Sequence, residues 1–104
     1  MPNYRTFDHL EADYFRAHPE EINPYLSEIF EAFAEDNDAG ALLASLRVVA
    51  QVQGLSALAQ ETGLSRQGLQ KALSEKGNPR LESVNSILHA LGYRLVPQEL
   101  DTRM

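Results

Sequence analysis

Residues 55–74 constrain the fold most strongly, because two short helical patterns meet there at a glycine. Ser56 can cap the first helix through its hydroxyl, and Gly63 tolerates the left-handed backbone that a sharp exit needs. Leu64 then fills the corner, and Ser65 caps a second helix. The second helix buries Leu69, Ala72 and Leu73 and leaves Arg66, Gln67, Gln70 and Lys71 outside. This order predicts a helix-turn-helix, the motif that lays its second helix in the major groove of DNA.

The outer face of the second helix carries the side chains that hydrogen-bond base edges and phosphates. Arg66, Gln67 and Gln70 are the expected base contacts, because arginine pairs with guanine and glutamine with adenine. The expected DNA-binding set is completed by residues better suited to phosphates: Ser65, Lys71, Ser74, Lys76, Asn78 and Arg80. Gly68 costs a helix about 0.8–1.0 kcal/mol relative to alanine, so we expect close approach of its backbone to DNA or to a neighbouring helix.

Length and composition indicate one domain of the helical class. A chain of 104 residues can bury a modest core without disulfides, and it contains no cysteine for a disulfide or a thiolate metal site. No apolar run reaches the roughly 18–20 residues of a membrane span, and the first residues lack the apolar core of a signal peptide. We therefore expect a soluble, cytoplasmic protein.

The acidic charge is unevenly distributed. The formal net charge is −6, yet residues 1–40 hold ten acidic groups against Arg5 and Arg16, while residues 41–104 hold seven basic groups against five acidic ones. Within 64–80, four basic residues stand against Glu75 alone. A local basic patch can hold phosphates on an acidic protein, because salt screens charges beyond about 8–10 Å. The acidic half is either a solubilising face or a surface for a basic partner.

The first 19 residues allow two interpretations. Their aromatic residues are too numerous for a solvated tail, and they indicate burial in this chain or against a partner. They can form a short helix ended by Pro19 or an extended arm packed on the body. Pro19 biases His18 away from helix in either case.

Two longer helices follow. Asn23 as cap and Pro24 as first helical residue predict a helix over about 24–35. Its apolar stripe is Leu26, Ile29, Phe30 and Phe33. Asp38 can cap the next helix, predicted over about 39–53 and closed by Gly54. That helix is expected to bury Leu42, Leu43, Leu46, Val49 and Ala50, and to leave Arg47, Gln51 and Gln53 outward.

The C-terminal part combines a helix with a β-prone stretch. A loop over 75–80 precedes a helix predicted at about 81–91, which would bury Leu81, Val84, Ile87, Leu88 and Leu91 and end at Gly92. Residues 93–96 alternate as a short strand does, and Pro97 stops them. The segment is either a tail packed on the core or a strand that pairs with its symmetry mate in a two-fold dimer.

No catalytic or cofactor constellation is evident. His9, His18 and His89 have no metal-binding spacing, and we expect neither a metal nor a cofactor. The carboxylates along 24–35 follow a helical spacing typical of a solvated face. A cysteine nucleophile, a Gly-x-Ser-x-Gly motif and a phosphate-cradling glycine loop are absent, so enzyme activity is not expected.

Residues from about 14 to 97 resemble HigA-like antitoxins, the addiction-module antidote proteins with a Cro/CI-type helix-turn-helix. The stretches that carry the resemblance are His18-Pro19-Glu20-Glu21-Ile22, Tyr25-Leu26, Gly54-Leu55-Ser56-Ala57-Leu58-Ala59, Gly63-Leu64-Ser65-Arg66-Gln67-Gly68-Leu69, Lys71-Ala72-Leu73-Ser74, Gly77-Asn78-Pro79 and Leu91-Gly92-Tyr93-Arg94-Leu95. The resemblance implies neutralisation of a RelE/ParE-like toxin and repression of the chain's own operon. The chain departs from the family pattern in its aromatic-rich residues 1–15.

The expected architecture is all-α, a five-helix Cro/CI-type domain with an N-terminal helical extension and a short C-terminal strand. Residues 1–36 would form the acidic extension and first helix, 37–97 the DNA-binding domain, and 98–104 a tail. The expected partners are a palindromic DNA operator, a toxin and a second copy of the chain. A stand-alone phage-type repressor and a protein-interaction inhibitor that no longer binds DNA remain as alternatives.

Overall fold

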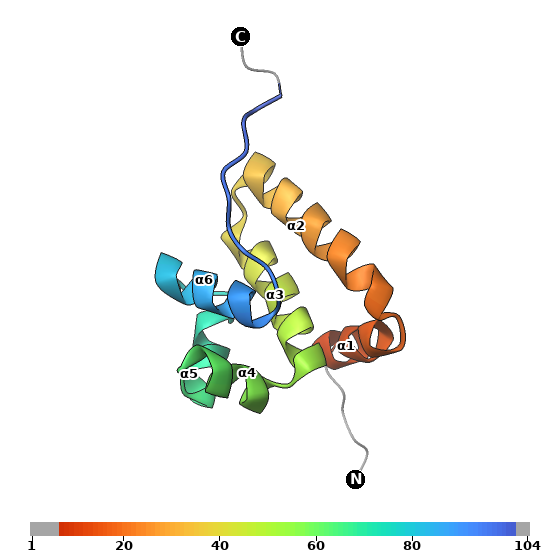
Figure 1. Ribbon diagram of the computed structural model, residues 1–104, viewed down its shortest axis with the longest axis vertical. Helices are drawn as coiled ribbons and strands as arrows, with labels where there is room; N and C mark the ends of the chain where they lie inside the picture. The colour runs from red at the N-terminus through yellow and green to blue at the C-terminus, as the bar shows by residue number, and fades with distance from the viewer. Residues whose placement is uncertain (1–6, 102–104) are drawn as a thin grey trace.

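The computed structural model describes residues 7–101, and every regular element within that range is a helix (Figure 1). The elements in chain order are α1 (Phe7–Ala17), the 3-10 turn η1 (Pro19–Glu21), α2 (Ile22–Asp36), α3 (Ala39–Gln53), α4 (Leu55–Thr62), α5 (Arg66–Ala72) and α6 (Leu81–Ala90). The all-α prediction is therefore confirmed.

Helix α3 lies at the centre because it is apolar on most of its surface. Its ends are those that the sequence predicts. Asp38 Oδ1 accepts a hydrogen bond from the Ala41 amide at 3.1 Å, and Gly54 ends the helix with φ +102°. Helices α1, α2 and α4 all pack against α3. Its buried residues are Leu42, Leu43, Leu46, Val48, Val49 and Ala50.

The main core is built from α2 to α6. Leu46, Leu58, Leu69 and Ile87 are at most 1 % exposed and come from four different helices. The aromatic and aliphatic stripe predicted for α2 packs on this core, with Leu26 fully buried. Within the described residues no charged side chain is buried, so apolar burial dominates the folding free energy.

The N-terminal segment is helical where the structure describes it, which confirms the first of its two interpretations. Helix α1 ends one residue before His18, as the following Pro19 requires. Phe15 is buried and its ring lies 4.7 Å from that of Tyr25. Arg16 Nη2 donates to the Gln51 carbonyl at 2.5 Å, which fastens α1 to α3. Tyr4 lies outside the described residues.

The predicted start of α2 is wrong by two residues. The helix begins at Ile22, directly after η1, so Asn23 and Pro24 lie inside its first turn. Pro24 is tolerated there because the first amides of a helix have no intrahelical acceptor. The 3-10 turn Pro19–Glu21 leads directly into the helix, whose first turn has no side-chain cap.

Ser56 does not cap α4. The helix begins one residue earlier, at Leu55, and Gly54 serves both as the end of α3 and as the residue that precedes α4. A glycine at φ +102° turns the chain sharply enough for the two helices to follow without a loop. The Ser56 side chain is consequently left exposed on the surface of α4.

The C-terminal predictions need two corrections. Leu81, expected in the core, is 75 % exposed because it is the first residue of α6 and precedes the buried stripe. Residues 93–96 form no strand in the range 7–101, since no neighbouring strand offers a backbone to pair with. They leave α6 as an extended segment that rises past α2 (Figure 1).

No single helix in the described range is long and apolar enough to cross a membrane. Helices α3 and α4 pass such a test only when taken together, and they are bent by 102° at Gly54.

Candidate nucleic-acid interface

Helices α4 and α5 form one unit through a three-residue turn. Gly63 adopts the left-handed conformation at φ +79°, and its amide donates to the Ala59 carbonyl at 3.0 Å. The Thr62 hydroxyl also bonds the Ala59 carbonyl and accepts from the Leu64 amide, at 3.2 and 3.3 Å. Leu64 packs against the core at the corner. The predicted roles of Gly63 and Leu64 are confirmed.

Ser65 is the cap of α5. Its hydroxyl oxygen accepts from the Gly68 amide at 2.9 Å, while its own proton stays free to be donated. A Cβ on Gly68 would lie 3.0 Å from that same oxygen, and no neighbouring helix lies within 4 Å of it. The expectation that a neighbouring helix requires this glycine is therefore wrong. The cap itself supplies a reason, because the serine oxygen occupies the space.

The outer face of α5 is polar and open. Arg66, Gln67, Gln70 and Lys71 are all exposed, as predicted. Arg66 Nη1 donates to the Ser56 hydroxyl at 3.4 Å, a long and weak contact that leaves the guanidinium able to turn toward a ligand. Buried Leu69 and Leu73 hold the opposite face of the unit against the core.

A hollow of about 540 Å³ lies beside this face. Lys71, Ser74, Lys76 and Asn78 line it, so four of the predicted phosphate-binding residues meet around one depression. Arg80 does not line the hollow; its side chain is 84 % exposed and lies 3.9 Å from Glu82. The structure thus brings most of the predicted phosphate contacts to one place.

The hydroxyl of Ser74 is less available than that of Ser65. It donates to the Lys71 carbonyl at 2.9 Å, an oxygen that also accepts from the Ser74 amide at 3.3 Å near the end of α5. A hydroxyl has one proton, so Ser74 can donate to a phosphate only by giving up this bond.

Two residues that shape this site escape sequence analysis. Arg47 was expected to point outward, but it is partly buried and its Nη1 donates to the Leu73 carbonyl at 2.8 Å, where α5 ends. A Cβ on Gly77 would lie 2.5 Å from the Ala72 carbonyl oxygen, so only glycine fits where the loop passes α5. A glycine within a loop is a sequence signal for a close approach of two backbone segments, so the role of Gly77 could have been predicted. The sequence around Arg47 carries no comparable signal.

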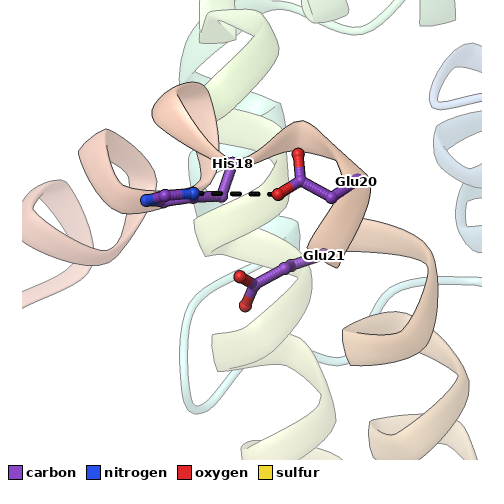
Figure 2. Close-up of side chains that lie close together, drawn as sticks. All are labelled: His18, Glu20 and Glu21. Atoms are coloured by element: carbon purple, nitrogen blue, oxygen red, sulfur yellow. Dashed lines mark ion pairs between the residues drawn. The ribbon is translucent and has the colours of Figure 1, made fainter.

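A separate polar group lies between α1 and α2. Figure 2 shows His18, Glu20 and Glu21 around η1. One imidazole nitrogen and one oxygen from each carboxylate lie within 4.8 Å of one another, and His18 Nδ1 is 3.7 Å from Glu20 Oε2. Histidine spacing alone missed this trio, because two of its members are carboxylates. The Tyr14 hydroxyl donates to both oxygens of Glu21 at 2.9 and 2.8 Å. That bond, with desolvation and the negative charges of Glu21 and Glu20, raises the pKa of Tyr14.

These features define an all-helical protein with an exposed polar helix beside a basic hollow. A family model described as "Probable addiction module antidote protein" matches residues 3–98, and the chain belongs to this family. An uncharacterized protein of Haemophilus influenzae (strain ATCC 51907 / DSM 11121 / KW20 / Rd) is 39% identical over 99 residues, which cover 95% of this chain and 92% of the relative. No solved structure matches the chain.

Family membership confirms the antitoxin prediction at its coarse level. An antidote is the toxin-neutralising member of an addiction module, so the family implies a toxin partner of some kind. Such antidotes generally act by binding rather than by catalysis. The match covers α1 to α6, and therefore includes the acidic half as well as the α4–α5 unit.

Proposed function

We propose that this chain is the antitoxin of a type II toxin–antitoxin module, that it neutralises a RelE/ParE-like toxin, and that it represses its own operon through a Cro/CI-type helix-turn-helix formed by α4 and α5. The observation that carries the DNA-binding part is the open polar face of α5 beside a hollow lined by cations. The family match favours a toxin-dependent protein over a stand-alone repressor.

In this proposal α5 enters the major groove of the operator. Arg66, Gln67 and Gln70 read base edges, each good bidentate pair contributing about 1–3 kcal/mol of discrimination. Lys71, Ser74, Lys76 and Asn78 contact phosphates from the hollow, and Ser65 and Arg80 contact them from outside it. Because α5 has only 7 residues, one copy reads few base pairs, and specificity calls for two copies on a palindrome with half-sites about 34–36 Å apart.

A pair of substitutions tests the division between phosphate and base contacts. We expect Lys71→Gln to weaken binding to operator and unrelated DNA alike and to reduce the slope of log affinity against log salt by about 1. We expect Gln67→Ala to alter which operator variants bind best and to leave the salt slope unchanged. Fluorescence anisotropy over a salt series with a small operator-variant panel measures both.

Glu99→Gln serves as the control, because it changes the net charge by one unit, in the opposite sense, on a segment outside the α4–α5 unit. It should leave the slope and the sequence preference as they are. If Lys71→Gln and Gln67→Ala behave alike, the assignment of separate roles is wrong. If the wild-type chain shows no preference for its own promoter, the repressor part of the proposal fails.

A further inference from the structure

The junction between α1 and α2 brings one imidazole and two carboxylates together. The Glu21 amide donates to the His18 carbonyl at 3.0 Å, and this bond closes the 3-10 turn that begins at Pro19. The turn gathers the side chains of His18, Glu20 and Glu21 around one space (Figure 2). His18 Nδ1 lies 3.7 Å from Glu20 Oε2, and a ligand atom of Glu21 lies within 4.8 Å of both other residues' ligand atoms. A short local turn thus supplies three metal-ligating groups of two chemical kinds.

Tyr14 of α1 holds this arrangement through two contacts. Its hydroxyl donates to both oxygens of Glu21, and its ring centroid lies 4.5 Å from that of the His18 imidazole. The bond to Glu21, with desolvation and the charges of Glu21 and Glu20, raises the pKa of Tyr14, so the phenol keeps its proton. A donor that hydrogen-bonds a carboxylate in this way orients it for a metal ion.

The negative charge of the two glutamates is not offset by a cation of the chain. Within residues 7–101 neither Glu20 nor Glu21 pairs with a lysine or an arginine, and nearby Arg16 pairs with Asp13 at 2.7 Å. A divalent cation bound between the two carboxylates offsets their charge. An imidazole nitrogen together with carboxylate oxygens suits Zn²⁺, whereas Mg²⁺ and Ca²⁺ prefer oxygen ligands alone.

We propose that His18, Glu20 and Glu21 bind one Zn²⁺ ion at the junction of α1 and α2, with water as the fourth ligand. Zinc bonds of about 2.0–2.2 Å place the ligand atoms of a tetrahedral site about 3.4 Å apart. The His18–Glu20 pair is already close to that spacing, and the flexible Glu21 side chain closes the remaining distance. One Glu21 oxygen then binds the metal while the other keeps its bond from Tyr14.

The proposal departs from the expectation that the chain binds no metal, because that expectation rested on the spacing of the histidines. It also gives the metal a structural effect. His18 directly follows α1 and Glu21 directly precedes α2, so the ion ties the two helices together. A ligand that binds the folded chain more tightly than the unfolded chain raises Tm. The site needs neither toxin nor DNA and is therefore independent of the proposed function.

Isothermal titration calorimetry of the untagged chain with zinc chloride tests the site. We expect one equivalent of Zn²⁺ to bind, and His18→Gln and Glu20→Gln each to raise the Kd at least tenfold with the helical circular dichroism unchanged. His89→Gln is the matched control, because it removes an exposed histidine of α6 that joins no metal-ligating group within residues 7–101. It should leave the Kd as it is. Zn²⁺ should raise the Tm of the wild-type chain and of His89→Gln, but not that of His18→Gln.

Paramagnetic Co²⁺, a substitute for Zn²⁺, locates the ion by nuclear magnetic resonance. We expect the first additions to broaden the amide signals of residues 14–22 and to spare those of Glu28, Glu31 and Glu35 on α2. The proposal is overturned if Zn²⁺ shows no saturable binding, or if His89→Gln weakens binding as much as His18→Gln does. It is also overturned if the broadening spreads evenly along α2, because the ion is then attracted by carboxylates in general.

Discussion

Arg47 of α3 reaches across to the end of α5. Its guanidinium, partly buried on α3, donates to the Leu73 carbonyl at 2.8 Å and so satisfies a carbonyl that has no partner within α5. Hydrogen bonds from a charged donor contribute about 1.5–3 kcal/mol. Arg47 therefore positions the end of the proposed recognition helix without facing DNA.

We expect Arg47→Met to lower the free energy of unfolding by about 1.5–3 kcal/mol, because it leaves the Leu73 carbonyl partly buried and without its donor. Urea denaturation followed by circular dichroism measures this loss. Arg66→Met is the matched control, because Arg66 is exposed and its contact with Ser56 is long. It should change stability by less than about 0.5 kcal/mol and still abolish operator preference. If Arg47→Met and Arg66→Met lower the free energy of unfolding equally, Arg47 does not position the end of α5.

Sequence could not assign Arg47 because a long cation on a helix is normally solvated. Hydrophobic periodicity identifies the apolar positions of a helix, but it does not show which backbone carbonyl at the end of another helix lies within reach of a polar side chain. Gly77 was visible as a loop glycine, whereas the reason for it, the Ala72 carbonyl 2.5 Å from the place of a Cβ, depends on how the loop folds back. Residue roles that depend on contacts beyond the local helical pattern were thus missed.

Helix ends provide the sharpest test at the level of elements. Ser65 accepts a bond from the Gly68 amide, whereas Ser56 lies inside the first turn of α4 and caps nothing. We expect Ser65→Ala to cost about 1 kcal/mol of unfolding free energy, within the range of about 0.5–2 for lost caps. Ser56→Ala should change it by a few tenths at most. Chemical denaturation of the two variants in parallel gives the comparison; a larger loss for Ser56→Ala would contradict the assigned caps.

The ends of helices were predicted correctly where a single residue sets them through a bond to a residue nearby in sequence. Asp38, Gly63 and Ser65 end or begin helices through bonds to residues at most four positions away, so their sequence context was sufficient. Ser56 failed because Gly54 alone both ends α3 and precedes α4. The strand over 93–96 could not be decided from one chain, since a strand exists only where a partner supplies the ladder.

At the scale of the whole molecule the charge is divided between two surfaces. The stretch from Pro19 to Ala39 carries seven carboxylates and no lysine or arginine, while the hollow beside α5 is lined by Lys71 and Lys76. Glu28, Glu31 and Glu35 of α2 are exposed and form no ion pair with the described residues. An unpaired row of this kind attracts a basic partner over several ångströms.

We expect the triple variant Glu28→Gln, Glu31→Gln and Glu35→Gln to lower the association rate with the toxin, most strongly at low salt. The matched control replaces Glu75, Glu82 and Glu99 by glutamine, the same change in net charge on the other half of the chain. Stopped-flow mixing over a salt series measures both variants. A rate that is equal for the two, or insensitive to salt, would point instead to an apolar interface built on the aromatic residues.

Helix α3 is common to both surfaces. It contacts α1, α2 and α4 and, through Arg47, reaches the end of α5. This helix, about 22 Å long, therefore connects the acidic half to the half that holds α4 and α5. Under the proposed function, a toxin that tilted this helix on binding would also move α5, and by thermodynamic reciprocity the operator would change the affinity for toxin by the same factor. Under the proposed function, promoter occupancy would then report the concentration of free toxin in the cell.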